Sequence, residues 1–233
     1  MLTPTPVLAR RAGTGVAVLP SRPRSGQHAC VHPAHANDVA FLTPGLVHEF
    51  GNLLLSIQGH ALQWNASGAQ GQPAILQSCD RGGRALRLFR HLLGENGSEP
   101  AEAASTLAEL ADLLRVPVRE RGQALEVQPA AGTGAVDLAS FVPLLVGGVR
   151  ALLTAVPDGH RGTVSLGLQR TAQGLVVAVR HRAAAGALPF RPAADDAARY
   201  LRALIGRRQW PFTVAIAADG IDLVQAASAV REA

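Results

Sequence analysis

The chain has no lysine, and all 22 of its basic side chains are arginine. Aromatic residues are also scarce, with six Phe, two Trp and one Tyr among 233 residues, so the core must be aliphatic. The exclusive use of arginine, together with abundant Ala and Gly, is typical of a GC-rich genome and favours a bacterial source. Because the arginines are dispersed and few aromatics accompany them, the net charge of +5 does not indicate a nucleic-acid partner.

Cysteine and long apolar runs are nearly absent as well. Cys30 lies in a polar stretch and Cys79 in an apolar helical pattern, so the two predict no disulfide framework and fit a reducing cytoplasm. No segment reaches the ~18 consecutive apolar residues of a membrane span. The N-terminal stretch is broken by Gly and Pro before any sustained apolar region, unlike a signal peptide. We therefore expect a cytoplasmic protein with no membrane partner.

Residues 1–38 repeat Pro, Gly, Ser and Arg without a hydrophobic period, which predicts a disordered tail. The pattern changes at Leu42, where Thr43 followed by Pro44 is a typical helix start. From there apolar residues recur every three or four positions, as on a helix that packs in a bundle. This stripe consists of Leu46, Phe50, Leu53, Ile57, Ala61 and Trp64.

A second stripe follows over residues 73–93, after a short segment rich in Ser and Gly. It consists of Ile75, Cys79, Gly82, Leu86, Phe89 and Leu93. Two such helices joined by a short loop predict an antiparallel hairpin over residues 39–94. Since a lone hairpin leaves apolar surface uncovered, we expect two copies to pair as a four-helix bundle, which makes the protein a homodimer.

The remainder of the chain predicts a polar, acidic linker over residues 95–104 and an α+β sandwich over 105–233, with helices over one sheet. Helical patterns cover 105–116, 136–156 and 193–205, and strand patterns cover 124–128, 163–169, 175–180, 212–217 and 221–225. Charge is uneven here, because 72–94 carry four arginines against Asp80, whereas 95–137 carry eight acids against three arginines. Either these are solvated helix faces or the arginines dock an acidic partner.

One histidine stands out on the first helix. His48 lies two residues past Leu46, about 200° around the helix, so it faces away from the apolar stripe. Asn52, at i+4, shares its face, and Glu49 is its neighbour in the chain. A phosphoryl acceptor needs an exposed, neutral imidazole nitrogen with an acid near enough to orient the ring or take its proton. His48, Glu49 and Asn52 are therefore the candidate catalytic residues, and an ordinary surface histidine is the alternative.

The string Val47-His48-Glu49-Phe50-Gly51-Asn52-Leu53-Leu54-Leu55-Ser56-Ile57 resembles the phosphoacceptor box of histidine kinases. Arg81, Arg84, Leu86 and Leu92-Leu93 resemble the returning helix of that family. The resemblance implies that His48 accepts the phosphoryl group, that Glu49 assists as a base, and that Asn52 positions water for phosphatase action. Gly51 departs from the polar or basic residue usual there and weakens the helix propensity.

Residues 105–233 are similar in element order to the family's ATP-binding domain, but its chemistry is missing. With Pro157-Asp158-Gly159 aligned, the Asn that would hold magnesium falls at Ala151 and its partner near Gly147, and neither offers an oxygen ligand. The strand over 175–180 leads into residues 181–186 without Asp-x-Gly-x-Gly, and a glycine-rich lid is absent. We therefore expect a degenerate ATPase-like domain with no bound cofactor and no ATP hydrolysis.

A phosphoacceptor hairpin joined to a degenerate ATPase-like domain is similar to the histidine phosphotransferases of bacterial phosphorelays. That resemblance implies transfer of phosphoryl groups between receiver domains of response regulators, with Mg²⁺ bound to the receiver. The receiver contacts expected on the hairpin are Leu55, Ser56, Arg84 and Arg87. Two alternatives remain open: a divergent but active histidine kinase, and a non-catalytic dimeric scaffold that sequesters a receiver.

Overall fold

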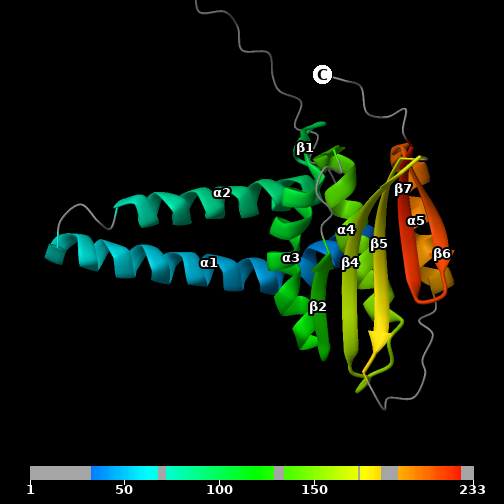
Figure 1. Ribbon diagram of the computed structural model, residues 1–233, viewed down its shortest axis with the longest axis horizontal. Helices are drawn as coiled ribbons and strands as arrows, with labels where there is room; N and C mark the ends of the chain where they lie inside the picture. Colours follow the sequence, from blue (N-terminus) through cyan, green and yellow to red (C-terminus); the bar gives the residue numbers. More distant parts are fainter. Residues whose placement is uncertain (1–32, 68–71, 129–133, 173, 185–193, 227–233) are drawn as a thin grey trace, which may run out of the picture. The chain divides into compact units, whose positions relative to one another are not determined.

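The computed structural model describes residues 33–67, 72–128, 134–172, 174–184 and 194–226, which form a helical hairpin followed by a mixed α/β domain (Figure 1). The predicted α+β fold is confirmed. Most of the predicted tail, residues 1–32, lies outside the described residues. Within the part of the chain that is described, no helix is both long enough and apolar enough to cross a bilayer.

The hairpin consists of α1 (Pro33–Ser67) and α2 (Gln72–Leu93), which lie side by side (Figure 1). Their faces meet at Gly82, where an added Cβ would lie 3.2 Å from Cδ1 of the buried Leu53. A small residue at this position lets the two helices approach closely. Ala85 and Leu88 continue the buried face of α2, so the predicted helical pairing is present in the structure.

The predicted start of the first helix is wrong. The helix α1 begins at Pro33 and runs through Pro44. A proline inside a helix costs about 3 kcal/mol or more, because it removes an N–H donor and crowds the preceding turn. Packing outweighs that cost here, since Leu42 is fully buried. Thr43 does not cap the helix, and its hydroxyl instead donates to the Val39 carbonyl oxygen at 2.8 Å.

The predicted linker contains β1 (Pro100–Glu102), which pairs antiparallel with β3 (Ala135–Asp137). The next helix, α3 (Ala103–Glu120), starts earlier than predicted because the Glu102 carboxylate caps it, accepting from the backbone N–H of Ser105 at 2.5 Å and of Ala104 at 3.1 Å. Hydrogen bonds from Ser105 and then Ala104 hold the pKa of Glu102 below its usual value. The helix also continues past Pro117, where the pattern had predicted its end.

The sheet contains five strands in the order β2-β4-β5-β7-β6. The strands are β2 (Gln123–Gln128), β4 (Gly162–Thr171), β5 (Gly174–Ala183), β6 (Phe212–Ala217) and β7 (Gly220–Ala226). β2 pairs parallel with β4, and the remaining pairs are antiparallel. The helices α4 (Leu138–Thr154) and α5 (Ala194–Arg208) complete the domain. The predicted helix over 136–156 begins only at Leu138 because residues 135–137 form a strand.

The core joins the hairpin to the domain that follows it. Leu42 of α1 and Leu92 of α2 belong to the same buried cluster as Leu145 of α4 and Val177 of β5. We refer to the described residues from Pro100 to Ala226 as the α/β body. The base of the hairpin is therefore packed onto the α/β body through an aliphatic core, as the composition predicted.

The helices α1 and α3 cross at a glycine. A Cβ on Gly45 would overlap the carbonyl oxygen of Leu113. That carbonyl lacks its usual helical donor, because the residue four positions later is Pro117. The methylene of Gly45 can therefore approach an exposed acceptor, a geometry found in weak Cα–H···O contacts at helix crossings. This contact requires glycine because any side chain would meet backbone, which cannot move aside.

Gly45→Ala is expected to lower the free energy of unfolding by about 3 kcal/mol, the cost of overpacking a close helix crossing. The measurement is urea unfolding followed by circular dichroism. Gly83→Ala on α2 is the matched control, because a Cβ there meets nothing within 4 Å. That change should stabilise the helix by about 0.5–1 kcal/mol. Equal changes in the free energy of unfolding for the two variants would contradict a close crossing of α1 and α3 at Gly45.

Candidate functional site

His48 lies on the exposed side of α1, where the sequence placed it. Its Nε2 is 3.1 Å from the side-chain nitrogen of Asn52, one helical turn further on. With the amide nitrogen as the donor, Nε2 is the acceptor, which is the arrangement of an imidazole that carries its ring proton on Nδ1. His48 and Asn52 therefore share one exposed face of α1, as predicted, and Nε2 is the ring nitrogen that Asn52 contacts.

Glu49 occupies a different environment from the histidine beside it. Its residue is only 6% exposed, and both of its carboxylate oxygens are bound by Arg81 of α2, through Nε and through Nη2, the latter at 3.1 Å. Arg81 also lies 3.5 Å from Asp112 of α3. The carboxylate therefore links α1 to α2, and its assignment as a base for His48 stays a prediction.

Two of the predicted receiver contacts lie further along α1. Leu55 is 68% exposed and lies seven residues after His48, which places the two on one face of the helix. Ser56 is turned toward α2, where its hydroxyl lies 3.1 Å from the hydroxyl of Ser78. Of these two residues, Leu55 is the one available to a partner.

The other two predicted contacts, Arg84 and Arg87, bind acids of their own chain. They belong to a row of α2 arginines that face α3 and the segment before β1. The pairs are Arg81 with Asp112 at 3.5 Å, Arg84 with Glu109 at 3.2 Å, Arg87 with Glu99 at 3.3 Å, and Arg90 with Glu95 at 3.5 Å. The arginines of residues 72–94 thus have acidic partners within the chain. These pairs are partly exposed, so each contributes under about 1 kcal/mol.

A buried polar cluster that the sequence did not predict joins three helices. Asp38 of α1 is fully buried, and its carboxylate accepts from Arg150 Nε of α4 and from the Tyr200 hydroxyl of α5, each at 2.5 Å. The guanidinium of Arg150 lies 4.9 Å from the centre of the Tyr200 ring. Asp38 had been assigned to the tail, and the apolar residues that follow it, Val39 and Phe41, were the available signal of a helix.

The single tyrosine makes this cluster measurable. Burial, the charge of Asp38 and the hydrogen bond to Asp38 raise the pKa of Tyr200 to about 12. Absorbance at 295 nm should show the phenol ionising near that value in the folded protein and near 10 after unfolding. Since the unfolded state loses its proton first, stability should fall between pH 10 and 12. A midpoint near 10 in the folded protein would contradict the cluster.

The α4 positions that align with the kinase magnesium site carry no ligand. Ala151 is partly buried against the core, and Gly147 faces α5, because a Cβ there would lie 3.0 Å from the Tyr200 ring. Near the end of β5, where the adenine-reading Asp was expected to follow, His181 lies 3.0 Å from the Gln123 side chain, and its pKa is lowered mainly by burial. Among the described residues, no group of three or more His, Cys, Asp or Glu could hold a metal ion.

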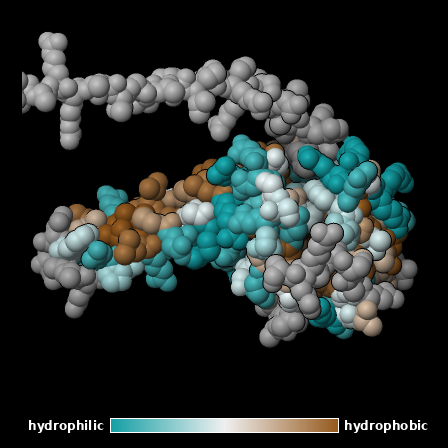
Figure 2. Space-filling model, turned by 90° about the horizontal axis from the view of Figure 1, so that it is seen from above, coloured by the Kyte–Doolittle hydropathy of each residue, from teal (hydrophilic) through white to brown (hydrophobic). Residues whose placement is uncertain are grey.

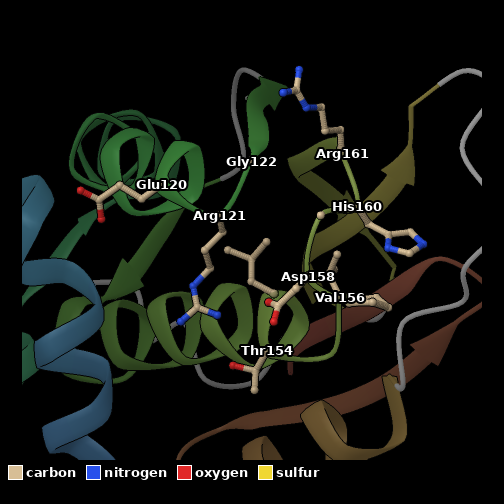
Figure 3. Close-up of a pocket in the computed structure, with 11 residues that line it drawn as sticks. Glu120, Arg121, Gly122, Thr154, Val156, Asp158, His160 and Arg161 are labelled. Atoms are coloured by element: carbon tan, nitrogen blue, oxygen red, sulfur yellow. The ribbon is translucent and has the colours of Figure 1, made fainter.

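A cavity of about 740 Å³ lies between the C-terminal ends of α3 and α4. Its lining includes Glu120, Asp158, His160 and Arg161. Figure 3 shows that the side chains of Glu120, His160 and Arg161 point in different directions. The cavity therefore offers no converging set of catalytic groups, and it lies away from the residues predicted for phosphoryl transfer. The Pro157-Asp158-Gly159 turn was the only feature of the sequence that pointed to this region.

Comparisons with known proteins find matches only among solved structures. No protein-family model matches the chain, and no curated protein matches it significantly. A bacterial phosphotransferase is similar at 17% identity and a TM-score of 0.34, over 81% of this chain and 95% of that one. The Acinetobacter baumannii histidine kinase AdeS is similar at 12% identity and a TM-score of 0.41, over 76% and 98%.

A histidine kinase from Burkholderia phymatum STM815 is similar at 17% identity and a TM-score of 0.41, over 84% of this chain and 98% of that one. The chain is thus structurally similar, at low identity, to histidine kinases and to a phosphotransferase over most of its length.

Proposed function

We propose that this protein is a phosphorelay component that does not use ATP. It accepts a phosphoryl group on His48 from the receiver domain of one response regulator and passes the group to the receiver domain of another. The observation that carries the proposal is the exposed His48 ring, whose Nε2 accepts a hydrogen bond from Asn52 at 3.1 Å. That arrangement holds Nε2 at the surface as a hydrogen-bond acceptor, the form in which an imidazole nitrogen can attack phosphorus. A scaffold that only binds a receiver has no need of it.

The transfer is a substitution at phosphorus. The Nε2 lone pair attacks the aspartyl phosphate of the donor receiver, an N–P bond forms, the P–O bond breaks, and the aspartate leaves as a carboxylate. The proton on Nδ1 can pass to water because the ring is exposed. The Asn52 amide, released from Nε2, donates to a phosphoryl oxygen. The second receiver reverses these steps, and Mg²⁺ bound to each receiver neutralises the phosphoryl charge.

Residues of the α/β body support a relay rather than a kinase. The fold implies a magnesium nucleotide, and the side chains at the aligned positions do not fit one. Gly147 and Ala151 carry no oxygen with which to hold the metal. Arg150, which lies between them, is bound to Asp38. These residues support a phosphoryl group that comes from another protein.

The outer face of the hairpin supports homodimerisation. Figure 2 shows hydrophobic side chains gathered along the hairpin. They include Val47, Leu54, Leu62, Leu76 and Leu86, each at least 46% exposed, with Trp64 at 44%. Val47, Leu54 and Leu62 recur every seven or eight residues and so share one side of α1. A contiguous apolar face of this kind marks a protein interface, and pairing with a second hairpin would cover it.

The experiment that tests the proposal compares two phosphoryl donors. The purified protein is incubated with radiolabelled Mg-ATP alone, and separately with receivers from the same genome, each purified and phosphorylated at aspartate. We expect label from at least one receiver and none from ATP. Label from ATP alone would establish a divergent kinase. Absence of label from every receiver would favour a scaffold.

A further inference from the structure

The start of α1 is embedded in the α/β body before the hairpin begins. Asp38, Phe41, Leu42 and Gly45 follow one another at spacings of three, one and three, which places them on one face of the helix. Asp38 and Leu42 are fully buried and Phe41 is 8% exposed. The guanidinium of Arg121, at the end of α3, lies 5.6 Å from the centre of the Phe41 ring. Residues 38–45 of α1 are therefore held against the α/β body by several buried side chains.

The part of the body that it covers is defined by Gly147 on α4. A Cβ there would lie 3.0 Å from the Tyr200 ring and 3.5 Å from the Asp38 carboxylate. In the alignment with the kinases, Gly147 and Ala151 are the positions of the two asparagines that serve the magnesium nucleotide. The first turns of α1 thus lie against the same face of α4.

We propose that residues 36–45 are a built-in occupant of the nucleotide face of the α/β body, with the Asp38 carboxylate in the place of a bound anion. Arg150 and Tyr200 form its receptor, one supplying a guanidinium and the other a phenol O–H. A nucleotide would have to expel a fully buried carboxylate and leave the Arg150 charge without its partner. The protein is closed to nucleotides by this contact in addition to the loss of the asparagines. This inference does not depend on transfer through His48.

Asp38→Asn tests the contact by removing the anion while keeping the size of the side chain. Hydrogen exchange is measured for the amides of residues 39–43, 45 and α4. In the wild type, the amides of residues 39–43 and 45 should be protected from exchange as strongly as those of α4. Breaking a buried charge pair should speed exchange of residues 39–45 by about 100-fold. Asp158→Asn, at an exposed aspartate, is the matched control and should change nothing.

Tyr200→Phe is the milder variant, in case Asp38→Asn fails to fold. Losing the hydroxyl donor should speed exchange of the same amides by about tenfold. Wild-type residues 39–45 that exchange as fast as a free peptide would overturn the proposal. So would exchange that neither variant changes.

Gly147→Asn tests the location of the contact. A side chain there meets Asp38 and Tyr200, so the substitution should displace residues 39–45 from α4 and speed the exchange of their amides. The variant should still not bind Mg-ATP. Gly206→Asn on α5 is the control, because a Cβ at that position meets nothing within 4 Å. Equal exchange rates in these two variants would place α1 elsewhere.

Nucleotide binding by the wild type completes the test. Calorimetric titration with Mg-ATP should show no saturable binding up to millimolar concentration. Saturable binding would overturn the proposal whether or not His48 accepts a phosphoryl group from a receiver. Because the protein is unmodified, this readout is free of any effect of substitution on folding.

Discussion

Replacing His48 with alanine should reduce phosphoryl transfer from a phosphorylated receiver to below about 1% of the wild-type rate, because the variant has no nucleophile and nothing nearby can replace it. Asn52 is an amide, and the Glu49 carboxylate is buried and bound by Arg81. The substitution lies on an exposed face, so the fold and the thermal stability should be unchanged. The measurement is single-turnover transfer of label from the receiver to the protein.

His60→Ala is the matched control for this experiment. His60 lies on the same helix and lines the groove between α1 and α2, which Asn52 also lines. Transfer to this variant should remain within a factor of about two of the wild type, as expected of a histidine that makes no bond to the transferred group. Equal losses of transfer in the two variants would mean that the substitutions disturb the packing of α1 and do not act through the imidazole of His48. Full labelling of His48→Ala would place the acceptor elsewhere.

Charging the apolar face of the hairpin should separate the homodimer that we propose. In the variant Leu54→Glu with Leu62→Glu, pairing would bury two carboxylates per chain without partners, which costs several kcal/mol. The dimer dissociation constant should rise by at least about 100-fold. Both side chains are 65% exposed in the single chain, so the fold itself should be retained. Sedimentation equilibrium measures the change.

Ile216→Glu provides the comparison for the dimer experiment. This side chain is 44% exposed, but it lies on the edge strand β6, away from the hairpin. Its substitution should leave the association constant unchanged. A wild-type protein that is monomeric at micromolar concentration would contradict dimerisation, and a dimer lost equally in both variants would place the interface elsewhere.

The hairpin and the strands could be predicted because their patterns are local. The stripe containing Leu53, the glycine at 82 and the hairpin signal Ala218-Asp219-Gly220 each specify structure within a few residues. The start of α1 could not be predicted in this way. Thr43 followed by Pro44 favours a helix start locally, and only the burial of Leu42 against the α/β body overrides it. The information lies in contacts more than 100 residues apart, such as Asp38 with Arg150.

The candidate site also contains some features that local patterns predict and others that depend on long-range packing. His48 and Asn52 could be placed together because an i, i+4 spacing fixes both on one helix face. The partners of Glu49, Arg84 and Arg87 depend on where α2 and α3 pack, which no local pattern specifies. The uneven charge along the chain fitted either solvated helix faces or docking of an acidic partner, and the structure shows instead that α3 and the segment before β1 of the same chain supply acids to the arginines.

A pulse-chase measurement can follow a phosphoryl group as it passes through His48. The protein is labelled from one phosphorylated receiver, separated from that donor, and mixed with unphosphorylated receivers and Mg²⁺. We expect the label to leave His48 and appear on an aspartate of a second receiver within seconds to minutes, a range set by ordinary single-turnover enzyme rates. Label that remains on the protein, or that is released only as inorganic phosphate with every receiver, would contradict the relay.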